Sequence, residues 1–200
     1  MDTPDMYGQE NTEVLVIDLS LAPGQGEAWK RPKWVVYMWS AVEILVVSNR
    51  WQVSSKLRAK TLRLFGARIG EHVILRPRMK VKFPWNLEIG DRSWIGEGVW
   101  IHNRDRVCIG SDVAISQETL ITTGSHNFRG DMGVITKAII VEDGAWITSR
   151  CVLTGGVKIG RSAVIQPLTR VSEDVPENSI YGSERPSVQG KRFTANPEKD

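Results

Sequence analysis

The stretch VEDGAWITSRCVLTGGVKIGRSAVIQPLTRVSEDV, residues 141–175, places an aliphatic side chain at every sixth position. A second series of small or medium side chains follows each aliphatic by four residues. The two series are Val141, Ile147, Leu153, Ile159, Ile165 and Val171, and Ala145, Cys151, Val157, Ala163, Thr169 and Val175. A period of six matches neither the 3.6-residue period of an α-helix nor the two-residue alternation of an isolated strand. It is typical of a solenoid in which each hexad forms one short strand and one corner, with the aliphatic side chain pointing inward.

The same six-residue step continues upstream, with interruptions. The further runs are Ile69, Leu75 and Val81; Ile89, Ile95 and Ile101; and Ile109, Ile115 and Ile121. The longest interruption lies between Ile121 and Val141, and its middle, residues 122–138, lacks the repeat. A solenoid accommodates insertions as loops on its outside, where functional residues are often found. We therefore predict a mainly β protein: a parallel β-helix of roughly six coils over residues 67–177, with a loop at 122–138.

The two ends of the chain differ from the repeat region. Residues 1–66 are predicted to form an N-terminal extension and a helical segment, with the first twenty or so residues poorly ordered or extended. Residues 178–200 are predicted to form a C-terminal extension. The apolar run WVVYMWSAVEILVVS, residues 34–48, is too short to span a membrane and contains Glu43. Basic and tryptophan side chains flank this run, which suits a helix packed on its own domain or on a neighbouring subunit, or one lying at a membrane surface.

Composition places the chain among ordinary soluble globular proteins. Its 200 residues suit one domain, and a formal charge of +3 without a block of Lys or Arg gives no indication of nucleic-acid binding. Cys108 and Cys151 form no CxxC motif, and no histidine stands at zinc-ligand spacing from them. We therefore expect reduced thiols, no metal, and a cytoplasmic protein; the run at 34–48 leaves open an association with the inner face of the membrane.

Several local strings resemble one protein family. They are LRLFGARIGEHVILRP, FPWNLEIGDRSWIGEGVWIHN, IGSDVAISQETLITTGSHNF, VEDGAWI and SEDVPENSIYGSERP, and they cover about residues 57–188. Together with the hexads, they resemble the hexapeptide-repeat acyltransferases, and among these the colanic acid biosynthesis O-acetyltransferases. The resemblance implies a left-handed β-helix, a homotrimer, and acetyl-coenzyme A bound in a groove between neighbouring subunits. It also implies a sugar or glycan intermediate of exopolysaccharide synthesis as the acceptor.

The resemblance further assigns site residues. It implies that His126, in the string TGSHN, is the general base, and that Asn103 and Trp146 bind the acceptor. It places Ser149 near the thioester end of the coenzyme.

The residues that contact the coenzyme phosphates are not carried over from the family. Ser172-Glu173 stands where many relatives have TK, and residues 182–186 read GSERP where the family has GNPAK. The charge could come from other basic side chains: Arg170, Arg185, Lys191 or Arg192.

A sugar hydroxyl is barely acidic, so its acetylation needs a base. A neutral imidazole can accept the hydroxyl proton as attack proceeds, which typically contributes ~10²–10⁴ in rate. A backbone carbonyl or a carboxylate on the other ring nitrogen would fix the tautomer, with Asp131 and Glu118 as candidates. No covalent acyl-enzyme is required, and Cys108 and Cys151 fall in or beside repeat positions, where burial rather than nucleophilicity is expected.

Each assignment has an alternative. His126 could be a solvated loop side chain, and Asn103 a corner residue. Trp94 and Trp100 are predicted to point outward into a subunit interface, and His102 either does the same or lines the acceptor cleft. An N-acetyltransferase of an amino nucleotide sugar would need the same base, and a non-catalytic scaffold for polysaccharide assembly would need none. A γ-type carbonic anhydrase shares the solenoid, but this chain lacks the close histidine pair of that family.

Overall fold

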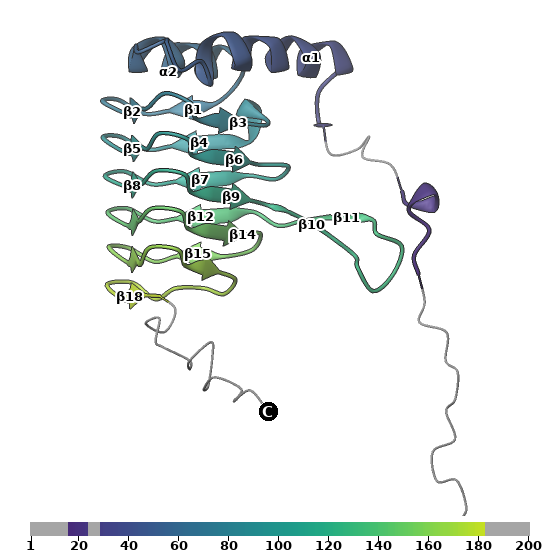
Figure 1. Ribbon diagram of the computed structural model, residues 1–200. Helices are drawn as coiled ribbons and strands as arrows, with labels where there is room; N and C mark the ends of the chain where they lie inside the picture. The colour runs from purple at the N-terminus through teal and green to yellow at the C-terminus, as the bar shows by residue number, and fades with distance from the viewer. Residues whose placement is uncertain (1–15, 24–28, 183–200) are drawn as a thin grey trace, which may run out of the picture.

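The computed structural model describes residues 16–23 and 29–182 (Figure 1). The expectation for the first twenty residues falls largely outside these ranges, as do Arg185, Lys191 and Arg192. Within them, the chain winds into a β-helix whose coils stack along one axis, with helices across one end (Figure 1). The predicted mainly β solenoid with an N-terminal helical segment is confirmed.

Each coil contributes short strands to three parallel sheets. Sheet 1 contains β1 (Arg68–Ile69), β4 (Leu87–Ile89), β7 (Val107–Ile109), β12 (Ile139–Val141) and β15 (Lys158–Ile159). Sheet 2 contains β2 (Ile74–Leu75), β5 (Trp94–Ile95), β8 (Ala114–Ile115), β13 (Trp146–Ile147), β16 (Val164–Ile165) and β18 (Ile180–Tyr181). Sheet 3 contains β3 (Lys80–Val81), β6 (Trp100–His102), β9 (Leu120–Thr122), β14 (Val152–Thr154) and β17 (Arg170–Val171).

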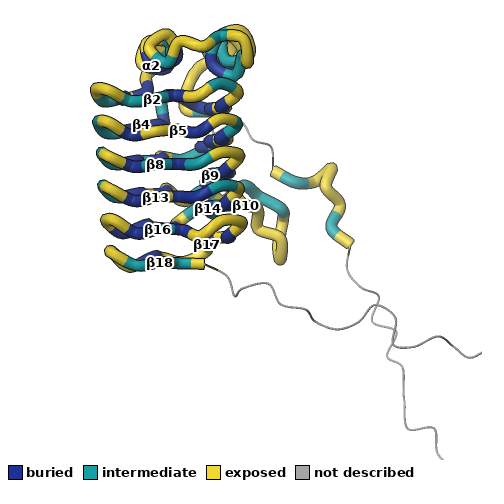
Figure 2. Tube along the Cα trace, turned by 60° about the vertical axis from the view of Figure 1, so that its left-hand side comes forward, coloured by how far each residue is buried: buried dark blue, intermediate teal, exposed yellow. Residues whose placement is uncertain are grey.

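The hexad aliphatics lie above one another inside the solenoid. In sheet 1, Ile69 pairs with Ile89, Ile89 with Ile109, and Ile109 with Val141. All four side chains are buried. Figure 2 shows such buried positions as dark-blue segments in coil after coil. Because each coil repeats the register of the one before it, the apolar side chains form one continuous column, which no single coil could bury alone.

The corner that precedes sheet 2 depends on left-handed backbone conformations and on side chains that bond to the neighbouring coil. Arg92 and Asp112 both have a φ of 58° and occupy this corner in successive coils. Their side chains form a bidentate ion pair, with N···O distances of 2.7 and 2.6 Å. Asp91 Oδ1 accepts the backbone N–H of Glu71 at 2.8 Å. Gly90 has no room for a side chain, because a Cβ there would lie 2.6 Å from the backbone of the next coil.

Two helices and a π-helical turn cover the first coil, and we call them the roof. The roof consists of α1 (Lys33–Val42), η3 (Glu43–Val47) and α2 (Ser55–Leu64); short 3₁₀ turns lie at η1 (Leu19–Leu21) and η4 (Pro84–Asn86). Trp39 is buried and its Nε1 donates to the Val81 carbonyl at 2.8 Å. Arg58 is fully buried and donates to backbone carbonyls, among them those of Val47 at 3.0 Å and Asn49 at 3.2 Å. These bonds fix the roof on the solenoid.

The apolar run at residues 34–48 extends through α1 and η3. In the described part of the chain, no helix combines the length and the apolar character needed to cross a bilayer.

Candidate active site

The longest interruption of the repeat forms an arm that leaves the solenoid. After β9 the chain forms β10 (Gly124–His126) and β11 (Val134–Thr136), which pair antiparallel and project away from the coils before β12 resumes sheet 1 (Figure 1). The base of the arm is held to the solenoid by backbone bonds, since Lys137 N donates to Thr123 O at 3.0 Å. The Thr123 hydroxyl in turn accepts the N–H of Asp105 at 2.9 Å.

His126 lies at the end of β10, where the arm turns. Its side chain is exposed, and its Nδ1 lies 2.8 Å from the backbone oxygen of Met132. A carbonyl oxygen can only accept, so Nδ1 carries the proton of this bond. In the neutral imidazole, Nε2 is then left as the unprotonated nitrogen. The bond therefore fixes the tautomer of the imidazole and leaves Nε2 able to accept a proton.

The loop backbone is shaped so that the Met132 carbonyl reaches the ring. Met132 has a φ of 58° and its N–H donates to Asn127 O at 3.1 Å. Asp131 accepts the N–H of Gly133 at 2.9 Å, so this carboxylate braces the turn. Asp131 therefore shapes the loop that presents the carbonyl to His126.

Of the two carboxylates considered as orienting partners, neither is bonded to the imidazole. Asp131 braces the turn, and Glu118 pairs with Arg78 at 3.6 Å. The imidazole is instead bonded to a backbone carbonyl, that of Met132, which is the other kind of partner expected from the sequence. Sequence could not indicate which one, because every residue has a carbonyl and the choice depends on the φ and ψ angles of the loop.

Trp146 and Ser149 lie on and after β13, in sheet 2. The Trp146 ring is 49% exposed on the outer face, and its Nε1 donates to Ser116 Oγ at 3.1 Å. Ser149 Oγ lies 3.5 Å from Gln117 Oε1. Ser116 and Gln117 were not singled out from the sequence; their position one coil before Trp146 and Ser149, after β8, is the signal that could have identified them.

The side chain of Asn103 is buried between two coils and is not exposed on the surface. Its Nδ2 donates to the Phe83 carbonyl at 2.7 Å, and its Oδ1 accepts the Phe83 N–H at 3.0 Å. The side chain is fully buried. These bonds give Asn103 a structural role in joining two coils; its contact with an acceptor stays a prediction.

His102, next to Asn103, lies on β6, which pairs with β9, the strand that leads into the arm. Its ring packs edge-on against Trp100, with centroids 5.7 Å apart, and its Nδ1 lies 3.5 Å from Thr122 Oγ1. Burial lowers the pKa of His102, and the charges of Arg104 and Lys82 lower it further. The ring therefore resists protonation, which suits a packed position on sheet 3.

One chain does not bring the expected residues together. His126 lies on the arm, whereas Trp146 lies on sheet 2, and Figures 1 and 2 show β10 and sheet 2 on opposite sides of the solenoid. A site that uses both residues would have to be completed by a neighbouring subunit.

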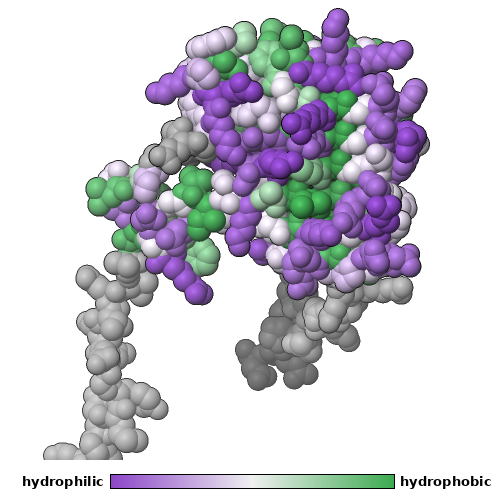
Figure 3. All heavy atoms as spheres, turned by 180° about the vertical axis from the view of Figure 1, so that it is seen from behind, coloured by the Kyte–Doolittle hydropathy of each residue, from purple (hydrophilic) through white to green (hydrophobic). Residues whose placement is uncertain are grey.

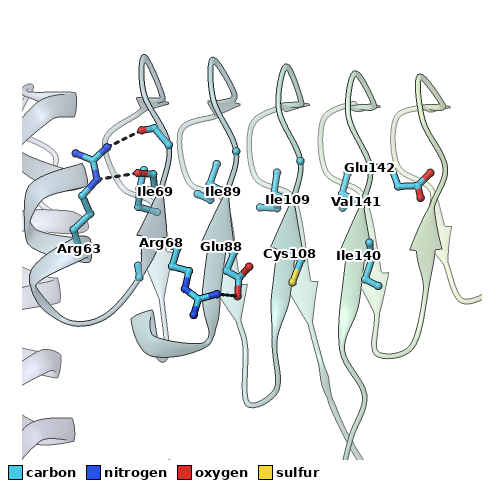
Figure 4. Close-up of a pocket in the computed structure, with 14 residues that line it drawn as sticks. Arg63, Arg68, Ile69, Glu88, Ile89, Cys108, Ile109, Ile140, Val141 and Glu142 are labelled. Carbon is cyan, nitrogen blue, oxygen red and sulfur yellow. Dashed lines mark hydrogen bonds and ion pairs between the residues drawn. The ribbon is translucent and has the colours of Figure 1, made fainter.

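The outside of the solenoid also carries a shallow groove. Seen from behind, an apolar band runs between hydrophilic flanks (Figure 3). A groove of about 650 Å³ follows sheet 1, where Arg68, Glu88, Cys108 and Ile140 follow one another on successive strands (Figure 4). Burial raises the pKa of the Cys108 thiol, and the Glu88 carboxylate adds to this. A raised pKa disfavours the thiolate, so Cys108 is a poor candidate for a nucleophile.

Comparison with known proteins gives the chain clear relatives, although no protein-family model matches it. It is 33% identical over 146 residues to the colanic acid biosynthesis acetyltransferase WcaF of Escherichia coli (strain K12). The matched segment covers 72% of this chain and 80% of that relative. It is 21% identical over 182 residues to the galactoside O-acetyltransferase of Lactococcus lactis subsp. lactis (strain IL1403), covering 88% of this chain and 83% of the relative.

A solved structure shows the same fold. The hexapeptide-repeat acetyltransferase of Vibrio cholerae O1 biovar eltor, complexed with acetyl-coenzyme A, matches with a TM-score of 0.69 at 24% identity. The match covers 76% of this chain and 83% of that protein.

Proposed function

The chain belongs to the hexapeptide-repeat acetyltransferases, and we propose on that premise that it transfers an acetyl group from acetyl-coenzyme A to a sugar hydroxyl, with His126 as the general base. The relatives whose names mention colanic acid and galactoside support a sugar acceptor. The bond between His126 Nδ1 and the Met132 carbonyl is the observation that carries the proposal. It leaves Nε2 as the nitrogen that can accept the hydroxyl proton.

The proposed reaction is a direct transfer. As Nε2 of His126 takes the proton, the acceptor oxygen attacks the thioester carbonyl and forms a tetrahedral intermediate. Collapse of the intermediate breaks the carbon–sulfur bond, and the imidazolium returns its proton to the departing sulfur. Neither cysteine supports a covalent step: the pKa of Cys108 is raised, and Cys151 is buried with its Sγ 3.2 Å from Gln166 O. The N–H groups needed for the oxyanion would come from the backbone near Trp146 to Ser149.

We place the site between subunits of a homotrimer. The outward residues of sheet 2 form an unbroken apolar ladder: Ile74, Trp94, Ala114, Trp146, Val164 and Ile180. Trp94 is 60% exposed in the single chain. Contiguous apolar surface of this kind is usually covered in an assembly. A neighbouring subunit packed here would bring its own arm, and so its His126, toward Trp146.

Trp146 and Ser149 are proposed to flank the acetyl group and the thioester end of the coenzyme. Since acetyl-coenzyme A is made and used in the cytoplasm, we propose a cytoplasmic location.

The acceptor is proposed to be a sugar hydroxyl in an exopolysaccharide intermediate. N-acetylation of an amino nucleotide sugar is the second candidate, because an amine needs the same base. The experiment that decides is incubation of the protein with labelled acetyl-coenzyme A and a panel of sugars, nucleotide sugars and amines, followed by mass spectrometry. Acetylation of hydroxyls is expected, and modification of amines alone would overturn the O-acetyl proposal. If no acceptor is acetylated, and if cells that carry His126→Ala still make the polysaccharide as before, a non-catalytic scaffold for polysaccharide assembly would be favoured.

A further inference from the structure

The roof is apolar on the face that packs against the solenoid and also on the face that points away from it. Val36 and Trp39 of α1 are buried, yet Trp34 on the same helix is 65% exposed and Leu64 on α2 is 81% exposed. Other exposed apolar side chains on and between these helices are Tyr37, Met38, Ile44, Leu45, Trp51, Val53 and Leu57. After Lys33, α1 has no charged side chain and is apolar on every face, and a helix of this kind is normally buried in protein or in lipid. Within the described chain nothing covers this outer face.

A groove opens between α1, α2 and η4, and we call it the roof groove. It has a volume of about 790 Å³ and is lined mainly by apolar side chains, including Trp34, Met38, Leu64, Phe65 and Trp85. An apolar hollow of this size can hold a hydrocarbon chain.

A second hollow continues from the roof groove, and we call it the basic pocket. It has a volume of about 410 Å³, and Arg31, Gly66 and Trp85 line both hollows. The cations along its wall are Lys30, Arg31, Arg68 and Arg106, against the single carboxylate of Glu88. That carboxylate is shared by two guanidinium groups, with distances of 3.2 Å from Arg68 and 2.9 Å from Arg106. Lys30 pairs with Asp105 at 3.7 Å, so the four cations face two carboxylates and the pocket keeps an excess of positive charge beside an apolar groove.

The sequence around the two hollows is also strongly basic. Residues 29–66 contain eight basic side chains and one acidic side chain, Glu43. The basic residues are Lys30, Arg31, Lys33, Arg50, Lys56, Arg58, Lys60 and Arg63. Glu43 is partly buried and accepts the N–H of Val81, which directs it toward the solenoid and away from the outer face. The outer surface of the roof thus combines tryptophan, aliphatic and cationic side chains without an acidic one, which is the composition of helices that lie on anionic membranes.

We propose that the roof groove and the basic pocket together bind an anionic membrane phospholipid, with a hydrocarbon chain in the groove and the phosphate against the basic pocket. Trp34 and Leu64 enter the headgroup region, and Arg31 stands where the two hollows meet. This binding does not depend on acetyl transfer, because neither hollow is lined by His126, Trp146 or Ser149. Its consequence is that the enzyme is held at a membrane surface, with the solenoid axis directed away from the lipid.

Cosedimentation of the full chain with vesicles tests the proposal. Vesicles of phosphatidylcholine alone are compared with vesicles that also contain phosphatidylglycerol, at low and at raised salt. The wild type should bind the anionic vesicles and be released by salt. The double variant Trp34→Ser/Leu64→Ser should bind at least about tenfold more weakly, since two large apolar side chains no longer enter the lipid. Arg31→Gln should bind about fivefold more weakly.

Matched controls lie at the other end of the solenoid. Leu168→Ser removes an exposed aliphatic side chain, and Arg161→Gln removes an exposed cation, and both should bind as the wild type does. Light scattering of the double variant separates lipid from a second copy of the chain as the occupant. Equal binding of wild type and double variant would overturn the proposal. So would a double variant with a smaller assembly mass than the wild type, because the roof would then be a subunit contact.

Discussion

His126 Nδ1 lies 2.8 Å from the carbonyl oxygen of Met132, a residue six positions further along the chain whose backbone is left-handed, with a φ of 58°. The turn between them brings the carbonyl back over the imidazole, so the arm contains its own orienting group. A base oriented by the backbone does not need a buried carboxylate, and His126 can therefore stand on an exposed arm and still present one defined nitrogen.

Replacement of His126 by alanine removes the proposed base without touching the core. Turnover should fall by ~10²–10⁴, while affinity for acetyl-coenzyme A changes little, because the imidazole acts on the acceptor proton. The side chain is exposed, so the free energy of unfolding should change by less than about 0.5 kcal/mol. Steady-state kinetics with coenzyme titration and thermal melting measure the two effects. A folded alanine variant with full activity would show that the base lies elsewhere.

Met132 offers a paired test of the orienting carbonyl. Met132→Gly keeps the carbonyl and adopts a positive φ without strain, so activity should stay close to that of the wild type. Met132→Val places a β-branched side chain at a positive φ and should displace the carbonyl, which lowers turnover by up to about 10²-fold through misplacement of the base. Turnover and KM of both variants are compared with melting temperature. Equal activity of the valine variant would show that the Met132 carbonyl does not position His126.

The hexads predicted the fold because their signal is local and repeated. Every coil needs an aliphatic side chain that points inward and packs on the coils beside it, as Ile89 and Ile109 do. The pattern in one stretch of sequence therefore predicts the other coils. The site lacks this redundancy. The Met132 carbonyl has no residue-type signature, and the two bonds of Asn103 to Phe83 join positions twenty residues apart, which only the stacking of coils brings together. The resemblance assigned Asn103 to the acceptor site, and the structure adds a role in joining two coils. The sequence alone cannot separate these two roles.

Asn103→Ala tests that structural role. The change leaves the buried N–H of Phe83 without a partner, while its carbonyl loses the Asn103 bond but keeps the N–H of Asn86 at 3.0 Å. The free energy of unfolding should therefore fall by about 1–3 kcal/mol. The effect is measured by thermal or urea unfolding, with Thr122→Ala, on the adjacent coil and half-buried, as a milder control. A variant that melts like the wild type but has a raised KM for the acceptor would instead place Asn103 in the acceptor site.

Glu43→Gln should change how stability depends on pH. Burial raises the pKa of Glu43, against the opposing effects of the Val81 N–H and of Lys82 and Lys80. A raised pKa means that the folded state holds the proton more tightly than the unfolded state, so the stabilisation is complete below the unfolded pKa and is lost as pH rises through the folded one. Glutamine keeps an oxygen for Val81 and never ionises. The variant should match the wild type at about pH 4 and have a higher melting temperature than the wild type at about pH 8. A melting difference that shrinks as pH rises would contradict this sign.

Mixed assemblies test whether the site lies between subunits. A chain with His126→Ala and a chain with Trp146→Ala are each expected to have low activity alone. If His126 of one subunit meets Trp146 of the next, every mixed trimer contains one interface at which both residues are intact, whichever chain is in excess. After dissociation and reassembly of equal amounts, about three quarters of trimers are mixed and about a third of their sites are intact, so roughly a quarter of wild-type activity should return. If both residues served one site within a single chain, no site in any mixture would be intact and activity would stay at the level of the separate variants. The same measurement on chains mixed without dissociation is the control, and it should show no recovery.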